Sequence, residues 1–434
     1  MKRSRWAALL AVLLTFSLIA AACGDDDDTS SGGDDGAASD DGSSDDGSSD
    51  DGSTDDGSTD DGTSDDGSTD DGTSDDGGDD PAAAGLARAE AFIADYLGTP
   101  TSINVSEPLP EVPSSDVTFY WAECNFPVCN TIGDGIEAAS ADLGWTFQRV
   151  PYNPGNPEEV GSVHLQGVQS GADVVGTSGR PASEWETAID AGMDAGVVFL
   201  DGYTTNDALG EENGIYACFG CEAQSQLAME MMVNYLIADS GGNATIIYST
   251  IPDFPIIAFR DTVMADVIDE NCPNCELVTV EHSIQNLLEG AIPGRLISEI
   301  QNQSDAENLY VFFSFGDQSF GFADAVDEAG LLESVKIMGH DPGIGNLLNV
   351  RDGRELAWGG NPVVHVGYVM VDCYARILQD VGCNPDTLLP TEILVQGSQG
   401  LADAIAFNEE AGYNSPYVGV PGFQDEFRAL WGVG

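Results

Sequence analysis

The sequence predicts an α/β protein made of two doubly wound parallel-sheet lobes that are joined by a multi-strand hinge. Two observations support this fold class. Short, nearly continuous apolar runs alternate with amphipathic runs of helical period, as expected for parallel strands that helices cover on both faces. The alternation continues over about 300 residues, which is enough chain for two such lobes.

Nine apolar runs are expected to be strands, at 117–122, 145–150, 173–176, 196–200, 214–218, 244–249, 277–280, 309–315 and 335–339. The expected helices include 81–96, 131–143, 222–238, 256–269, 284–302, 318–330 and 363–381. This order assigns 81–115 to an N-terminal helix and a Pro-rich lead-in, 116–210 with 362–390 to a first lobe, and 211–361 with 391–434 to a second. Hinge segments are expected near 204–215, 358–365 and 384–395.

The N-terminus has the anatomy of a signal peptide. Lys2, Arg3 and Arg5 precede an apolar run that stops at Cys23. Residues 18–23 resemble a bacterial lipobox, so we expect 1–22 to be a lipoprotein signal peptide and Cys23 to carry the lipid. The alternative is an ordinary cleaved signal peptide with an incidental cysteine. No later stretch has the ~18 apolar residues that span a bilayer, so the mature protein is expected outside the cytoplasm, anchored to the outer face of the cytoplasmic membrane.

Residues 24–80 repeat the pattern DDGSS, DDGST and DDGTS, and hold 24 Asp with no basic residue. Such a segment has too little apolar surface to offset the entropy of ordering. We therefore expect 23–80 to be a lipidated cysteine followed by a disordered tether. The five-residue period does not fit a calcium-binding loop of the EF-hand type, which requires Asp at position 1 and Gly at position 6.

The remaining chain is strongly acidic, with a net charge near −41 and only ten Lys and Arg after residue 5. Such a surface repels nucleic acid, which we therefore exclude as a partner. The sequence contains no H-E-x-x-H, G-x-S-x-G or Walker-type motif. We accordingly predict that the protein is not an enzyme, and we predict no cofactor, no metal and no catalytic residue.

Eight cysteines follow Cys23 and lie in close pairs: Cys124 and Cys129, Cys218 and Cys221, Cys272 and Cys275, Cys373 and Cys383. In an exported protein an even count in local pairs favours disulfides. The spacing alone leaves the connectivity open. The two C-x-x-C pairs also have the spacing of zinc ligands or of a redox motif.

Polar and aromatic side chains follow the expected strands, at the sheet edge where doubly wound folds bind ligands. The candidates for ligand contact are Asn125, Phe126, Arg180, Asp201, Tyr203, Arg260, Asp317, Asp341 and Asn361. Carboxylates, amides, a guanidinium and aromatic faces suit a neutral molecule rich in hydroxyls. The alternatives are helix capping or an exposed loop position for the three Asp, a surface ion pair for Arg260 and a solvated loop position for Arg180.

From about 116 to 400 the chain resembles the type I periplasmic-binding protein family, in its sugar-binding branch that serves ABC importers. The resemblance depends on the order of the segments ADLGW, QGVQSGADVV, DAGMDAGVVFLD, FFSFGDQSFGFADAVDEAG, VKIMGHD and GRELAWGGNP. By position it implies a hydroxyl-binding role for Asp201, a second-lobe ligand contact for Arg260 and a later ligand contact for Asp341. Asn361 stands where a ligand-binding Gln is common.

Several positions depart from the family pattern. Gly202 and Gly316 stand where Arg and Asn are frequent, and Val128 and Cys129 replace two Phe. Rings that cover a sugar must then come from elsewhere, with Trp121, Phe126, Tyr203, Phe219 and Trp358 as the candidates.

The resemblance implies a monomeric, lipid-anchored protein that captures a sugar or polyol and delivers it to an ABC permease. Two other functions stay open. One is a receptor that presents its closed form to a membrane sensor. A redox or metal-binding surface protein that uses the C-x-x-C pairs is the third alternative.

Overall fold

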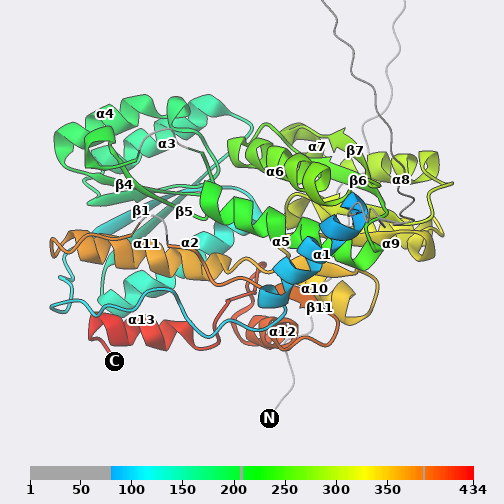
Figure 1. Ribbon diagram of the computed structural model, residues 1–434. Helices are drawn as coiled ribbons and strands as arrows, with labels where there is room; N and C mark the ends of the chain where they lie inside the picture. Colours follow the sequence, from blue (N-terminus) through cyan, green and yellow to red (C-terminus); the bar gives the residue numbers. More distant parts are fainter. Residues whose placement is uncertain (1–79, 206–208, 385–386) are drawn as a thin grey trace, which may run out of the picture. The chain divides into compact units, whose positions relative to one another are not determined.

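All nine apolar runs form strands in the computed structural model, which describes residues 80–205, 209–384 and 387–434. The predicted signal peptide, Cys23 and nearly all of the predicted tether lie outside these residues. The strands form two separate sheets, so the predicted fold class of two parallel-sheet lobes is confirmed (Figure 1).

The first sheet has the order β2-β1-β3-β4-β5 and is parallel throughout. Its strands are β1 (Thr118–Cys124), β2 (Thr146–Tyr152), β3 (Val174–Gly176), β4 (Val198–Gly202) and β5 (Ile215–Phe219). The helices of this lobe are α2 (Pro127–Leu143), α3 (Pro157–Gln169), α4 (Glu186–Ala195), α11 (Val363–Ile377) and α13 (Phe423–Trp431).

The central strand β1 shows why the apolar runs are continuous. Tyr120 and Ala122 pack into one core cluster with residues of α3 and α4, whereas Phe119 and Trp121 pack into another with residues of α2 and α11. Both faces of the strand are therefore buried, as parallel sheets require.

The second sheet has the order β11-β10-β9-β8-β6-β7, in which only the β10–β11 pair is antiparallel. Its strands are β6 (Thr245–Thr250), β7 (Glu276–Glu281), β8 (Leu309–Phe313), β9 (Lys336–His340), β10 (Ala357–Gly359) and β11 (Ile393–Val395). The helices of this lobe are α1 (Pro81–Ile93), α5 (Glu222–Ser240), α6 (Pro255–Asn271), α7 (Ile284–Leu288), α8 (Ile292–Asn302), α9 (Phe322–Glu328), α10 (Ile344–Arg351) and α12 (Gln399–Ala411).

The N-terminal helix α1 packs against α5 and α6 of this second lobe (Figure 1). Its Gly85 lies so close to α6 that an added Cβ would come within 2.2 Å of the carbonyl oxygen of Asn271. The segment that leads from α1 to β1 then crosses to the first lobe.

The lobe boundaries differ from the predicted ones in two places. The strand β5 pairs with β4 in the first sheet, although the predicted boundary at residue 211 assigned it to the second lobe. The first crossing into the second lobe therefore lies at 220–221, between β5 and α5, and not at 204–215. The last helix, α13, packs against α11 of the first lobe, although 391–434 was assigned to the second.

The second crossing lies at 360–362, between β10 and α11, within the predicted segment 358–365. These two crossings meet at the carboxyl ends of strands from both sheets. They position the polar residues that follow the strands.

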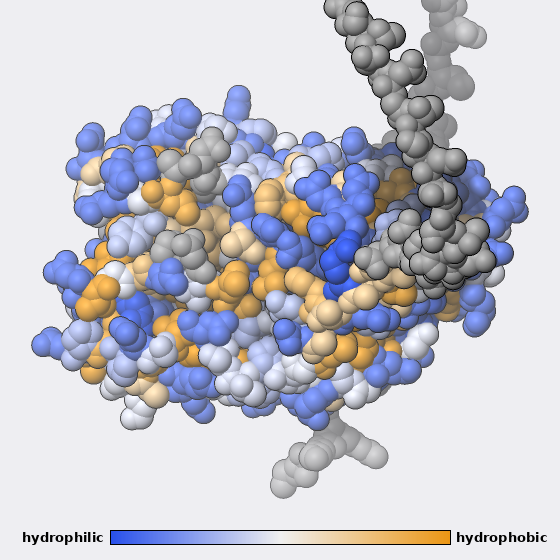
Figure 2. Space-filling model, viewed as in Figure 1, coloured by the Kyte–Doolittle hydropathy of each residue, from blue (hydrophilic) through white to orange (hydrophobic). Residues whose placement is uncertain are grey.

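The face of the molecule in Figure 2 is mainly hydrophilic around its outer edge, with hydrophobic residues gathered in smaller areas between the hydrophilic ones. In the described part of the chain, no helix combines the length and the apolar character that crossing a membrane requires.

Candidate binding site

A pocket lies between the lobes, at the carboxyl ends of their strands. The first lobe lines it with Cys124, Phe126, Val128, Cys129, Ile132, Ser178, Gly179 and Tyr203. The second lobe contributes Phe254, Ile256, Ile257, Arg260, Phe315 and Asp341. The cavity measures about 60 Å³.

Four polar side chains form one hydrogen-bonded network at this pocket. Asn361 Nδ2 donates to the Tyr203 hydroxyl oxygen at 2.8 Å and also to Asp341 Oδ1. Arg260 Nη1 donates to Asp341 Oδ2 at 2.8 Å and to the carbonyl oxygen of Ser314 at 2.7 Å. The network thus connects the end of β4, the 360–362 crossing, the end of β9 and helix α6.

The carboxyl group of Asp341 is held as a carboxylate. Burial alone would raise its pKa, but His340 and the Arg260 guanidinium outweigh burial and hold the pKa well below its usual range. His340 Nδ1 lies 3.1 Å from Asp341 Oδ2. Burial and the charge of Asp341 raise the pKa of Tyr203 well above its usual value, so Tyr203 keeps its hydroxyl proton.

Two pocket residues have backbone conformations that residues other than Gly rarely adopt. Tyr203 has a φ of 51° and Asp341 a φ of 58°. Strained conformations of this kind are concentrated at functional sites.

Two glycines make these conformations possible. A Cβ on Gly220 would lie 2.5 Å from the Tyr203 ring, and one on Gly316 would lie 2.2 Å from the carbonyl oxygen of Asp341. The glycine at 316, where the family often has Asn, is therefore required by the close approach of the Asp341 backbone.

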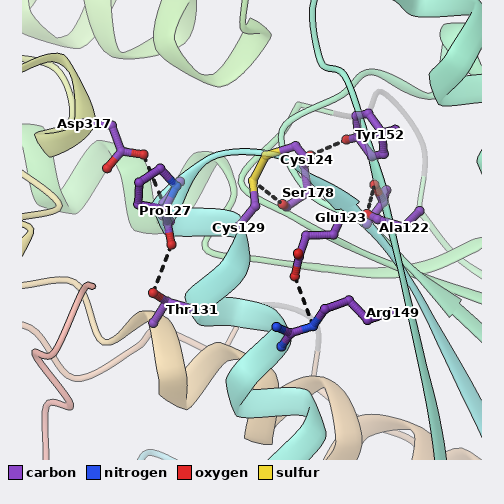
Figure 3. The surroundings of a disulfide bond; sticks show 12 residues. Ala122, Glu123, Cys124, Pro127, Cys129, Thr131, Arg149, Tyr152, Ser178 and Asp317 are labelled. Carbon is purple, nitrogen blue, oxygen red and sulfur yellow. Dashed lines mark hydrogen bonds and ion pairs between the residues drawn. A yellow bond between two sulfur atoms is a disulfide. The ribbon is translucent and has the colours of Figure 1, made fainter. Parts of the chain in front are cut away.

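The disulfide Cys124–Cys129 joins the end of β1 to the first turn of α2 across the short β1–α2 loop, and both cysteines line one wall of the pocket (Figure 3). This loop carries Phe126 into the pocket. The Ser178 hydroxyl donates to Cys129 Sγ at 3.4 Å. The disulfide therefore holds both ends of the segment that carries Phe126.

The first turn of α2 also meets the second lobe. The backbone N–H of Val128 donates to Asp317 Oδ2 at 3.4 Å, and Figure 3 shows Asp317 facing the start of α2. Burial raises the pKa of Asp317 to about 7, even though this hydrogen bond lowers it. Phe126 and Phe254 add an edge-to-face contact across the lobes, with ring centroids 6.0 Å apart.

Five predicted ligand contacts lie outside the pocket lining: Asp317 and Asn361, which are described above, and Asn125, Arg180 and Asp201. Asn125 is exposed on the β1–α2 loop. Asp201 is fully buried on β4, where it accepts a hydrogen bond from the Gly202 N–H. Arg180 is buried and pairs with Glu184 through both Nε and Nη2, while its guanidinium lies 5.9 Å from the centre of the Phe254 ring.

Sequence reasoning missed several pocket residues, namely Ser178, Phe254, Ile256, Ile257 and Phe315. Phe315 was placed inside the expected strand 309–315, whereas β8 ends at Phe313, and Phe254 follows β6 by a short loop. Trp121, Phe219 and Trp358, which were candidates for stacking on a sugar, are buried in the cores and do not line the pocket. Phe126 and Tyr203 from that set do line it.

All eight described cysteines are paired in disulfides between sequence neighbours: Cys124–Cys129, Cys218–Cys221, Cys272–Cys275 and Cys373–Cys383. The two C-x-x-C pairs are thus each closed on themselves and present no thiolates for zinc in this structure. No cluster of possible metal ligands occurs among residues 80–205, 209–384 and 387–434.

The chain is similar in structure to solved binding proteins at low sequence identity. One is the glucose-galactose binding protein GanP from Geobacillus stearothermophilus (16% identity, TM-score 0.56, 64% of this chain and 97% of that one). Another is the 5-methylthioribose transporter solute-binding protein from Thermotoga lettingae (15% identity, TM-score 0.59, 76% of this chain and 100% of that one). A third is the fructose-binding periplasmic domain of a hybrid two-component system (14% identity, TM-score 0.58, 73% of this chain and 99% of that one).

No curated protein matches the chain. Residues 116–382, which are more than half of the sequence, match the family described as periplasmic binding protein domain. The matched range contains the strands of both lobes up to β10, the two crossings described above and the residues that line the pocket. The chain belongs to the periplasmic binding protein domain family.

Proposed function

We propose that the protein is an extracytoplasmic, lipid-anchored solute-binding protein that captures a small hydroxyl-bearing ligand, a sugar or a polyol, between its lobes and delivers it to an ABC importer. The family fold is a non-enzymatic binding fold. Proteins with the same fold have been solved with D-fucose, D-arabinose and D-allose bound, which supports a ligand of this class.

One observation carries the proposal. Asn361 Oδ1 is buried at the pocket network and has no hydrogen-bond partner within the described residues. The amide nitrogen of the same side chain is occupied by Tyr203 and Asp341, so the orphan atom is an acceptor. A buried acceptor without a donor is costly. A ligand hydroxyl would supply the missing donor.

Lobe closure is the proposed mechanism. Both lobes contribute side chains to the pocket, so a ligand that touches both stabilises the closed arrangement in proportion to the contacts that the open one lacks. We propose Phe126, Tyr203, Arg260, Asp341 and Asn361 as the ligand contacts. Asp317 acts at the contact between the lobes.

A thermal-shift panel of pentoses, hexoses and polyols tests this proposal, because a ligand that binds only the folded protein raises its melting temperature. Hits are followed by calorimetry and by small-angle scattering with and without ligand. We expect at least one sugar or polyol to raise the melting temperature and to compact the protein. Asn361→Leu should weaken that ligand's affinity about tenfold or more. Absence of any hit, or hits without compaction, contradicts the proposal.

Three further variants test the residues outside the pocket lining. Asn125→Ala, Arg180→Ala and Asp201→Ala are compared for affinity and for melting temperature. A loss of affinity without loss of stability would add that residue to the ligand contacts. Equal affinities would restrict the site to the pocket lining.

Membrane attachment through Cys23 is a separate part of the proposal. Two acyl chains on one cysteine anchor a protein stably. Expression of the full chain and of its Cys23→Ser variant, followed by membrane fractionation and mass analysis of the N-terminal peptide, tests it. The wild-type protein should be found with the membrane and carry the lipid, and the variant should not.

A sensory role is the second candidate, supported by the likeness to the fructose-binding domain of a hybrid two-component system. Deletion of the gene distinguishes the two roles. Loss of uptake of the identified ligand indicates an importer. Normal uptake with loss of a ligand-induced transcriptional response indicates a sensor.

A further inference from the structure

The pocket points to a more specific ligand than a plain sugar. We infer that the ligand carries an apolar substituent on its hydroxylated part: an alkyl, alkylthio or aryl group on a sugar or polyol. This inference rests on the proposed function and narrows it.

The composition of the pocket wall is the first step. Fourteen residues line the cavity, and seven of them are Phe, Ile or Val. Two more are the cysteines of the Cys124–Cys129 disulfide, whose sulfurs are poor hydrogen-bond partners. Only four lining residues have polar side chains: Ser178, Tyr203, Arg260 and Asp341.

The second step is that these four residues are already engaged. Arg260 and Asp341 are bonded to each other, the Tyr203 hydroxyl oxygen accepts from Asn361, and Ser178 donates to Cys129 Sγ. A sugar with a hydroxyl on every carbon would place several of them against apolar walls. A buried hydroxyl without a partner is strongly disfavoured, and sites discriminate on that basis.

The third step is the arrangement of the apolar wall. Phe254 contacts Phe126 edge-to-face at 6.0 Å and Phe315 at 6.2 Å, so three rings from both lobes form one continuous aromatic surface. Ile256 and Ile257 at the start of α6 line the cavity beside these rings. Closing the lobes brings Phe126 against Phe254, so an apolar group beside these rings would be buried by closure itself.

The pocket therefore has a hydroxyl-binding part and an apolar part, and we expect one ligand whose two ends match them. The hydroxylated end meets the Asn361 acceptor and the Asp341 network. The apolar end meets the rings and the isoleucines. Each buried methylene or similar group adds about fourfold in affinity.

Matched ligand pairs test this inference on the mature chain with Cys23→Ser. D-Ribose is compared with 5-methylthioribose, and D-galactose with D-fucose, by isothermal titration calorimetry. We expect 5-methylthioribose to bind at least about tenfold more tightly than ribose, and fucose to bind more tightly than galactose.

Two variants of helix α6 provide the matched control. Ile257→Thr places a hydroxyl in the pocket wall, whereas Ile268→Thr makes the same change on the same helix at a buried position away from the pocket. Ile257→Thr should reduce the preference for 5-methylthioribose over ribose at least about threefold. Ile268→Thr should lower the melting temperature but leave the preference unchanged.

The outcomes separate this inference from the proposed function. If the unsubstituted sugars bind as tightly as the substituted ones, or more tightly, the inference is overturned and the proposed function stands. If the substituted ligands are preferred and both α6 variants leave the preference unchanged, the assignment of the apolar end to this wall is overturned. If neither member of any pair binds and the wider sugar panel is also negative, both fail.

Discussion

At the residue scale, Asp341 determines how the pocket is built. Its carboxylate is buried, and Arg260 is its charged partner. Removing one member of a buried ion pair costs about 3–5 kcal/mol because the other charge stays buried without compensation.

We therefore expect Arg260→Met to lower the free energy of unfolding by about 3 kcal/mol. Adding Asp341→Asn to that variant should recover part of the loss, since the unpaired charge is then gone. Ligand affinity should be lost in the single and in the double variant. Urea unfolding and calorimetry measure both quantities. A double variant that is no more stable than Arg260→Met would show that the charge pair is not the source of the cost.

Asp317 predicts a pH dependence of ligand binding. Its pKa is raised from 3.8 to about 7 in the closed arrangement, where burial disfavours its charge. Opening exposes the carboxyl and returns its pKa towards 3.8. Closing therefore takes up a proton between these two pH values. Affinity for a closing ligand should be highest near pH 4, should fall as the pH rises to about 7 and should then level off.

Calorimetric titrations from pH 4 to pH 8 on the wild type and on Asp317→Asn measure this effect. The variant cannot ionise at this position, so its affinity should not show the decrease that Asp317 causes between pH 4 and pH 7. Glu123, Glu355 and Glu392 also have raised pKa values, of about 6, 7 and 7, but they are present in both proteins. Identical pH profiles for the two proteins would exclude Asp317 as the group responsible.

Much of this network was predictable from sequence because polar residues that follow parallel strands share one sheet edge. Arg260, Asp341, Tyr203 and Phe126 were predicted on that ground, and all line the pocket. Phe254 and Phe315 were missed, because an apolar residue after a strand has the same pattern whether it lies in the core or in a cavity. The ion pair between Arg180 and Glu184, four residues away, was also not predicted from the sequence.

At the scale of elements, the strands were predictable and their partners in the sheets were less so. All nine expected runs are strands, although the edge strands β2 and β7 are partly exposed. β10 and β11, with three residues each, were not predicted. The expected helix 284–302 is two helices, because Gly290 adopts a φ of 67° and Pro293 lies in the first turn of the second helix. β5 pairs with β4, the strand just before it in the chain, so the lobe boundary predicted at 211 was wrong.

Among the elements, we expect ligand binding to depend most directly on the geometry of the β1–α2 loop. A disulfide that closes a loop of this size stabilises by about 2 kcal/mol. The pair Cys124→Ala with Cys129→Ala should lower the melting temperature and also weaken ligand affinity, since Phe126 and Val128 lie in the segment that the disulfide closes.

The Cys272–Cys275 disulfide provides the control, because it closes a loop of similar size and neither cysteine lines the pocket. Removing it by the same two changes should cost similar stability and leave affinity unchanged. Equal affinities for the two double variants would mean that the first bond has no part in shaping the site.

At the scale of the whole described region, direct contacts between the lobes include the Phe126–Phe254 ring contact, the hydrogen bond from Val128 to Asp317 and the Arg180 guanidinium near Phe254. Phe254 takes part in two of these three contacts. A ligand that adds contacts to both lobes shifts the balance between open and closed forms.

Truncating Phe254 should therefore shift that balance towards the open form. We expect Phe254→Leu to increase the radius of gyration of the ligand-free protein and to weaken affinity about tenfold, with little change in melting temperature. Phe322→Leu is the matched control, because Phe322 is buried within the second lobe against Phe313 at 5.1 Å. It should lower the melting temperature through lost core packing and leave the radius of gyration unchanged. Scattering profiles of the two variants, with and without the ligand found in the panel, decide the matter. If Phe254→Leu is as compact as the wild type, the aromatic contact does not hold the lobes together, and closure must depend on the polar contacts at Asp317.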